Sequence, residues 1–302
     1  MKSIASSAVL TLSLIGGGAF AADLSSHKLP PLPELPAMET TPWAGFYIGL
    51  NAGGAWNAST AVNLLSAPVF VAPGIGEEIW AATSSFAASR ALSTQAAGFI
   101  GGGQLGYNWR FSETFIAGVE ADIQGVAGGA NSARNVSLLP TPAAGLSYLT
   151  TLSASKRLDY LGTVRGRIGY LVTPTLLAYA TGGLAYGGVT ARADFFQTIP
   201  NDTPGFELLA INAGRFSNTR AGWTVGGGLE WMFSSDWSLK AEYLYYDLGG
   251  VTFPTGVTTD QAFGALIMIS NNHASTRFDG HIARAGVNYH FNWDADPVVA
   301  SY

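Results

Sequence analysis

Cysteine is absent from the 302-residue chain, and charged residues are scarce. The lack of cysteine excludes disulfide scaffolds, thiolate metal sites and cysteine nucleophiles. Asp, Glu, Lys and Arg together make up only 12% of the sequence, about half of their share in typical soluble domains. A large water-soluble protein would struggle to cover its surface with so little charge. The formal net charge of −5 is mild, and it gives no signature of a nucleic-acid partner.

Long apolar runs are also missing. No segment after residue 21 reaches the run of about 20 apolar residues that a membrane-spanning helix needs. The short apolar run at the start follows Lys2 and ends before Ala19-Phe20-Ala21. A basic start, an apolar stretch and a small-x-small site predict a secretory signal peptide over residues 1–21, cleaved on export. Five prolines in residues 22–42 predict an extended periplasmic linker.

Between Trp43 and Trp293, eight segments alternate apolar residues with polar or small ones at a period of two. Successive side chains of a strand point to opposite faces, so this period predicts β-strands. The segments are GFYIGLNAGGAWN (45–57), GFIGGGQLGYNWR (98–110), TFIAGVEADIQG (114–125), KRLDYLGTVRGRIGY (156–170), TLLAYATGGLAYGGV (175–189), RAGWTVGGGLEWMF (220–233), WSLKAEYLYYD (237–247) and HIARAGVNYHFNW (281–293). The fifth is the least clearly two-faced.

The connections between these segments alternate in length. Short ones lie near residues 111–113, 173–174 and 234–236, and long ones cover about 58–96, 128–155, 191–218 and 249–279. Each segment has the 9–11 residues that a tilted strand needs to cross a bilayer. The pattern predicts an all-β fold over residues 43–293: an eight-stranded antiparallel up-and-down transmembrane β-barrel with short periplasmic turns and four long outer loops. Residues 294–302 form a C-terminal tail.

The strands of a soluble β-sandwich also alternate apolar and polar residues, with the charged face toward water. Aromatic residues decide between the two folds, because they gather near the short turns and where the first strand enters. Such a belt is typical of a membrane interface, and a soluble sandwich has no reason to collect tryptophans at one end of its strands. We therefore expect lipid on the apolar faces. The predicted aromatic girdle is Trp43, Phe46, Trp109, Trp231, Phe233, Trp237, Phe291 and Trp293.

The charged faces of the strands then point into the barrel. An eight-stranded interior is just wide enough for side chains to fill it, and buried charges must pair. We therefore expect a plug of paired charges. Its predicted members are Arg110, Glu120, Asp122, Arg157, Asp159, Arg165, Arg167, Arg220, Glu230, Lys240, Glu242 and Arg284. Bases outnumber acids in this set, so the alternative function, a narrow solute pore, would lean toward anions.

Taken together, the eight segments resemble the small outer-membrane β-barrel family, also called porin-family or immunogenic outer-membrane proteins, whose transmembrane part is the OmpA-type eight-stranded barrel. The resemblance covers nearly all of the mature chain outside the loops. It implies a surface protein of the Gram-negative outer membrane with structural, antigenic and sometimes haem-binding or weak pore roles. The partners it implies are outer-membrane lipid, lipopolysaccharide and the barrel-assembly machinery. Members usually end on an aromatic residue of the last strand, whereas here DADPVVASY follows Trp293.

No motif fixes a catalytic or metal-binding geometry, so we predict neither enzymatic activity nor a cofactor. His273, Ser275, Asp279 and His281 could activate a hydroxyl in a lipid-modifying enzyme, but polar residues are common in such loops. The chain's four histidines show no metal-ligand spacing. A haem-binding role would need an axial ligand such as His273 or Tyr148.

The long loops contain unexpectedly apolar stretches at residues 62–75, 136–149, 206–211 and 263–270. Exposed apolar patches are usually either buried or functional. We favour the interpretation that these stretches extend the strands above the membrane or pack against one another. The alternative is an adhesive surface for a protein partner or for self-association.

Overall fold

The computed structural model describes residues 43–74, 76–128, 131–143, 145–200, 206–207, 209–262 and 265–291. The predicted signal peptide, linker and tail lie outside these ranges, as does Trp293. Every helix and strand described below belongs to one compact unit, Thr40–Tyr302.

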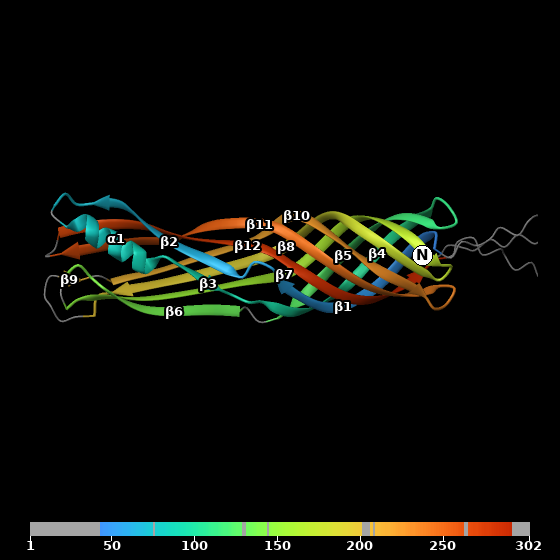
Figure 1. The fold of residues 1–302 in the computed structure, drawn as a ribbon, viewed down its shortest axis with the longest axis horizontal. Helices are drawn as coiled ribbons and strands as arrows, with labels where there is room; N and C mark the ends of the chain where they lie inside the picture. The colour runs from blue at the N-terminus through green and yellow to red at the C-terminus, as the bar shows by residue number, and fades with distance from the viewer. Residues whose placement is uncertain are drawn as a thin grey trace, which may run out of the picture. The chain divides into compact units, whose positions relative to one another are not determined.

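Eight antiparallel strands close into a ring, which we call the closed barrel (Figure 1). Each barrel strand pairs with the next one along the chain, and the last returns to pair with the first. This arrangement confirms the predicted eight-stranded up-and-down barrel. The strands are β1 (Gly45–Asn57), β4 (Ala97–Arg110), β5 (Phe115–Ala127), β7 (Ser147–Thr173), β8 (Leu176–Thr198), β10 (Leu209–Met232), β11 (Trp237–Ala262) and β12 (Ala265–His290).

Three tight turns join the strands at one end of the closed barrel. The backbone N–H of Phe111 donates to the carbonyl of Phe115 at 3.0 Å, and that of Phe233 donates to the carbonyl of Trp237 at 3.1 Å. The third turn, between β7 and β8, contains Pro174. The long connections all leave from the opposite end, as the sequence predicts.

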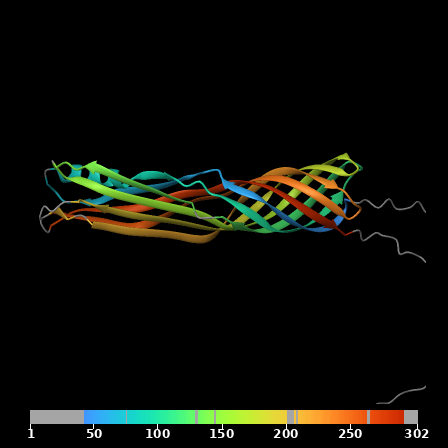
Figure 2. The same ribbon diagram turned by 90° about the horizontal axis from the view of Figure 1, so that it is seen from below.

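Five strands continue beyond the closed barrel (Figure 2). Strands β1, β4 and β5 have 13 or 14 residues, whereas β7, β8, β10, β11 and β12 have 23 to 27. The long loops add four strands and a helix to them: β2 (Ala61–Val71), α1 (Glu77–Ala88), β3 (Arg90–Ser93), β6 (Asn131–Pro140) and β9 (Phe206–Glu207). We call this part the extension. Because the apolar loop stretches lie largely in its strands, they extend the sheet, as the favoured interpretation predicts.

The extension has its own apolar core. Inward-facing side chains that form it include Val62, Leu64, Leu152, Phe195, Phe253 and Phe278. Helix α1 packs against this interior: the Ser84 hydroxyl donates to Gln197 Oε1 at 3.0 Å, and Ser85 lies 3.2 Å from the Ser270 hydroxyl. In the described part of the chain, no helix combines the length and the hydropathy of a membrane-spanning helix.

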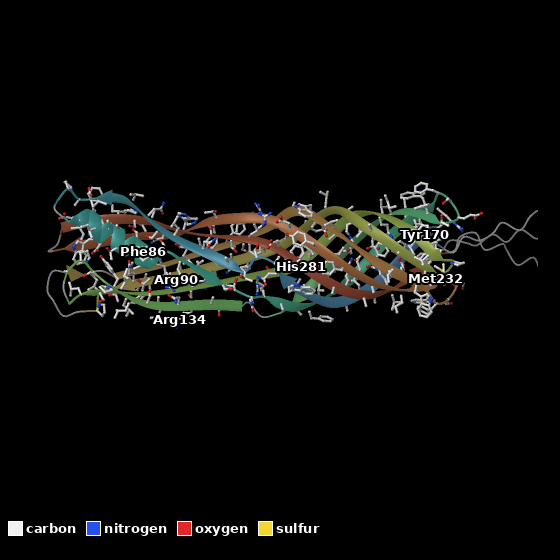
Figure 3. The ribbon with its side chains drawn as sticks, viewed as in Figure 1. Phe86, Arg90, Arg134, Tyr170, Met232 and His281 are labelled. Carbon is white, nitrogen blue, oxygen red and sulfur yellow. The ribbon has the colours of Figure 1, made fainter. Side chains whose placement is uncertain are left out.

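The sheet of the extension is open along one seam. Among the described strands, β3 pairs only with β2, and β6 pairs only with β7. Helix α1 contacts β2, β6, β7 and β12, and therefore lies close to this seam. Ile79 and Phe86 remain exposed on the outer side of α1; Phe86 is labelled in Figure 3.

A bulge in β7 exchanges the inner and outer faces of that strand. Its register with β8 shifts between Leu158 and Tyr160, which makes Asp159 the extra residue of a β-bulge. Even-numbered residues are buried before the bulge, from Tyr148 to Lys156, and odd-numbered residues are buried after it, from Leu161 onward. The sequence interpretation assumed one unbroken alternation through this segment and was wrong on that point.

Candidate functional site: the charged barrel interior

Eight Asp, Glu, Lys and Arg side chains meet inside the closed barrel, and each is at most 2% exposed. They come from β5, β7, β10, β11 and β12, whose inward positions face one another across the narrow lumen. We call them the interior network: the acids Glu120, Asp122, Glu230 and Glu242, and the bases Arg165, Arg167, Lys240 and Arg284.

Glu120 lies at the centre of the interior network. Both of its carboxylate oxygens accept hydrogen bonds from Lys240 Nζ at 2.7 Å. Oε2 also accepts from the Tyr47 hydroxyl at 2.6 Å, and Oε1 accepts from Arg165 Nη2. Donors from β1, β7 and β11 therefore converge on one carboxylate, which ties together strands from different sides of the ring.

Two arginines bridge the remaining acids. Arg165 donates from Nη2 to Asp122 and from Nη1 to Glu242, both at 2.9 Å. Arg284 Nη2 donates to Asp122 at 2.9 Å, and Arg284 Nε donates to Glu242 at 2.8 Å. The planar guanidinium offers five N–H donors in a fixed geometry, so one arginine can satisfy several carboxylates at once.

Glu230 anchors the part of the network nearest the short turns. It accepts from Arg167 Nη2, from the Ser238 hydroxyl and from Asn288 Nδ2, each at 2.6 Å. His290 Nε2 lies 2.9 Å from Ser238 Oγ. The side chain of His290 therefore points into the barrel, where it is 1% exposed.

Tyr179 belongs to this site but escaped the sequence analysis. Its hydroxyl donates to Glu242 at 2.9 Å, and the Arg167 guanidinium carbon lies 4.2 Å from the centre of its ring. Tyr179 lies in the segment whose alternation is weakest, between alanines on both sides. The one signal that could have identified it is that Tyr179 is the only large polar residue in residues 175–181.

Four predicted members lie outside the interior network. Arg110 donates to the Ser112 carbonyl at 3.0 Å and the Glu113 carbonyl at 2.9 Å, because it ends β4 at a short turn. The β7 bulge turns Arg157 and Asp159 away, and the two pair with each other. Arg220 donates to the carbonyl of Gly250 at 3.3 Å, beside a register shift in β11. The predicted excess of bases is therefore wrong for this interior: four bases face four acids.

Apolar layers seal the interior network on both sides. Below it, toward the short turns, Trp43, Ile116, Leu171, Leu177 and Met232 pack together. Above it, inward side chains that include Ile100, Leu161, Leu244 and Ile282 are buried in the apolar cluster that continues into the extension.

Trp43 seals the barrel instead of joining the girdle, which corrects the prediction. Gly45 has a φ of 108°, a conformation that favours glycine, and the chain turns inward just before β1. The Trp43 indole N–H donates to the carbonyl of Pro174 at 2.9 Å, and its ring meets the His290 ring edge-on at 5.9 Å. The side chain is only 1% exposed.

The other described girdle residues point outward near the short turns: Phe46, Trp109, Trp231, Phe233, Trp237 and Phe291. A second exposed group lies near the opposite end of the closed barrel: Trp56, Phe99, Tyr186, Trp223 and Tyr243. We call this the upper girdle. Phe46 and Trp56 are ten residues apart on β1, a rise of roughly 25 Å on a tilted strand. That height matches the apolar band of an outer-membrane barrel.

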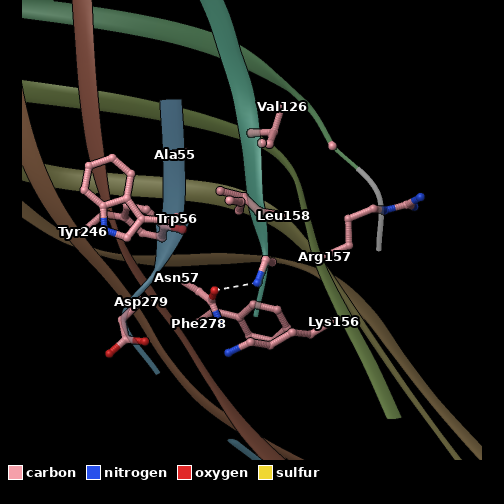
Figure 4. Close-up of a pocket in the computed structure, with 14 residues that line it drawn as sticks. Ala55, Trp56, Asn57, Val126, Lys156, Arg157, Leu158, Tyr246, Phe278 and Asp279 are labelled. Carbon is pink, nitrogen blue, oxygen red and sulfur yellow. Dashed lines mark hydrogen bonds between the residues drawn. The ribbon is translucent and has the colours of Figure 1, made fainter. Parts of the chain in front are cut away.

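A small cavity lies just above the closed barrel, where β1 and β5 end (Figure 4). Its volume is about 50 Å³, room for a few water molecules. Trp56, Lys156, Phe278 and Asp279 are among its lining residues. The buried Lys156 ammonium donates to the carbonyl of Arg277 at 3.0 Å and to that of Ser59.

The burial of Lys156 is expected to make the free energy of unfolding increase with pH. Burial lowers the pKa of Lys156 from 10.5 to about 8, although Asp279 opposes the shift. Between these two values the unfolded chain binds a proton that the folded chain has released, so the free energy of unfolding increases with pH. We expect Lys156→Met to remove this part of the increase. Urea unfolding of both proteins from about pH 7.5 to about pH 10.5 measures it; parallel pH profiles would contradict the assignment.

The candidate catalytic residues of the last strand do not converge. Asp279 is buried and accepts from the backbone N–H of Ser59 at 2.9 Å. His281 instead faces outward (Figure 3), where its Nδ1 lies 2.7 Å from the Tyr243 hydroxyl and its ring stacks on Trp56 at 5.8 Å. Tyr148, considered as a haem ligand, is buried and donates to the carbonyl of Trp80 at 3.5 Å.

Comparisons with known proteins place this geometry in a family context. A family model described as an outer membrane protein beta-barrel domain matches residues 32–291. The 31 kDa outer-membrane immunogenic protein of Brucella melitensis is 31% identical over 297 residues, which cover 96% of this chain and 100% of that protein. The 22 kDa outer membrane protein of Rhizobium leguminosarum is 30% identical over 164 residues, which cover 51% of this chain and 59% of that protein. The solved structure of OprG from Pseudomonas aeruginosa aligns with a TM-score of 0.36 and 13% identity, over 82% of this chain and 97% of that one.

Proposed function

Because the chain belongs to the outer-membrane protein β-barrel family, we propose that it is a closed surface barrel of the outer membrane, with a structural role in the envelope. In this proposal the closed barrel anchors the protein and the extension presents a folded surface for contact with the outside. The role is non-catalytic. Export through a cleaved signal peptide and insertion by the barrel-assembly machinery complete the proposal.

The observation that carries this proposal is the sealed interior network. Its four acids and four bases are paired across the lumen, and apolar layers close it on both sides. A conducting pore needs sites that bind an ion and release it along a continuous polar path. Here the charged groups bind one another instead, so the lumen stabilises the barrel and offers a solute no route.

The extension supports the surface role. Its apolar core, its helix and its paired strands form a folded body, which a set of loose loops would not provide. Exposed apolar side chains on it include Leu65, Val69, Phe70 and Ile79. Met268, by contrast, is 1% exposed, so any test of adhesion should replace the outward residues and leave Met268 in place.

Planar lipid bilayer recordings test the closed lumen. We expect the purified, folded full-length chain to insert and remain electrically silent, because no open polar path crosses the sealed network. A known porin inserted in the same bilayer controls for detection, and heat-modifiable gel migration shows that the sample is folded. Steady, ion-selective current from the folded chain would contradict the proposal and favour the narrow-pore alternative.

A further inference from the structure

Four arginines gather on the outer face of β6, β7, β8 and β10, just above the upper girdle: Arg134, Arg157, Arg192 and Arg215. Strand register places them on three successive rows of cross-strand neighbours. The positions between them carry short hydroxylated side chains: Ser153, Ser155, Thr190 and Ser217. We call these eight residues the arginine platform.

The charges of the platform are not balanced. Arg192 and Arg215 are directly opposite each other on β8 and β10, an arrangement of like charges that destabilises a sheet. Asp194 pairs with Arg192, with Nη2 2.9 Å from Oδ1, and Asp159 pairs with Arg157. Within the described residues, Arg134 and Arg215 have no ion-pair partner. Four bases against two acids give a local excess of positive charge in a chain whose net charge is −5.

The shape of the platform suits a phosphorylated sugar. The arginines are exposed, and the residues between them are short, so a ligand can lie close to the sheet with guanidinium groups around it. A guanidinium binds phosphate through two parallel N–H donors, and serine or threonine hydroxyls donate to and accept from sugar hydroxyls. The Thr190 hydroxyl is already 3.3 Å from the Ser217 hydroxyl, so these groups lie within reach of one ligand.

The height of the arginine platform on the strands indicates which ligand it meets. Arg192 is six residues beyond Tyr186 of the upper girdle on β8, roughly 15 to 20 Å along the strand. On β7, β8 and β10 the platform continues the surface that faces lipid lower on these strands. It therefore faces sideways, toward neighbouring lipid headgroups. We propose that the arginine platform binds the phosphate groups of lipopolysaccharide in the outer leaflet around the barrel.

This inference rests on the outer-membrane location and not on the closed lumen, so the bilayer recordings and the following experiment can fail separately. The test compares the full-length chain with the double variant Arg192→Ser, Arg215→Ser. Arg90→Ser is the matched control, since Arg90 is exposed, lies on β3 outside the platform and has no ion pair among the described residues. Figure 3 labels both Arg90 and Arg134.

Each folded protein is incubated in mild detergent with intact or phosphatase-treated lipopolysaccharide, and the lipid retained per protein is measured after gel filtration. We expect the double variant to bind intact lipopolysaccharide about tenfold more weakly or worse, given the strength of charged hydrogen bonds. We expect Arg90→Ser to bind like the unaltered chain, and the unaltered chain to lose affinity for the phosphatase-treated lipid. An Arg192→Lys, Arg215→Lys variant keeps the charge without the paired donors and should bind at an intermediate level.

Equal retention by the unaltered chain and a folded double variant would overturn the proposal, as would equal binding of intact and phosphatase-treated lipid. A sulfated oligosaccharide that binds the platform while lipopolysaccharide does not would assign the site to a soluble glycan and overturn the lipid assignment. If the serine variant fails to show heat-modifiable migration, the lysine variant and the phosphatase comparison still decide the outcome.

Discussion

Replacing Glu120 with glutamine is expected to lower the free energy of unfolding by about 3–5 kcal/mol. Lys240 Nζ donates to both oxygens of this carboxylate, and Arg165 donates to one of them. Glutamine keeps the volume but removes the charge, which leaves buried cations without their counter-ion. Breaking a buried pair in this way is costly because the remaining charge stays desolvated.

Urea unfolding in lipid vesicles, followed by tryptophan fluorescence and by heat-modifiable gel migration, measures the effect. Glu113→Gln is the matched control, because Glu113 is an exposed glutamate in the turn that precedes the same strand. Adding Lys240→Met to Glu120→Gln should restore part of the loss, since it removes one of the uncompensated cations. A Glu120→Gln barrel as stable as Glu113→Gln would show that the interior network contributes little.

The Gly102→Ala substitution is expected to lower the free energy of unfolding by about 1–3 kcal/mol or more. A Cβ built at this inward position of β4 would lie 2.0 Å from the carbonyl oxygen of Ile123 and 2.7 Å from the Cα of Gln124 on β5. Both are backbone atoms, so the methyl group cannot be accommodated by a side-chain movement. The two strands would have to move apart at this position.

The neighbouring glycine provides a control within the same strand. A Cβ at Gly103, which points to the other face, would meet only the carbonyl oxygen of Gly49 at 3.7 Å, an ordinary contact. Gly103→Ala should therefore fold and unfold like the unaltered chain in the same urea titration. If both alanine variants behave alike, backbone approach is not the reason for the glycine run at residues 101–103.

The period-two alternation was sufficient to predict the closed barrel. Each barrel strand exposes one face to an apolar surrounding and the other to a polar interior, so the signal repeats eight times in one chain. The family match confirms the resemblance that these segments suggested. The extension could not be predicted in detail, because pairings such as β2 with β12 join residues about 200 positions apart and leave no local pattern.

The interior network was predicted where the alternation is regular. Glu120, Arg165, Glu242 and Arg284 lie on uninterrupted stretches and were assigned to the interior from their spacing. Arg157 was misplaced because a bulge has no compositional signature in this segment. Trp43 was misplaced because the inward turn at Gly45 depends on a single backbone angle. Tyr179 was missed because its small neighbours hide the alternation.

The Asp159 bulge has a consequence for which mutations β7 can tolerate. Positions that resist a bulky substitution should be even-numbered from Tyr148 to Lys156 and odd-numbered from Leu161 to Gly169, because these side chains are buried. The buried positions of β7 thus change from even-numbered to odd-numbered at Asp159. Substitutions at outward positions of the upper half therefore change the surface of the extension and leave the interior network in place, because the network residues of β7, Arg165 and Arg167, lie beyond the bulge.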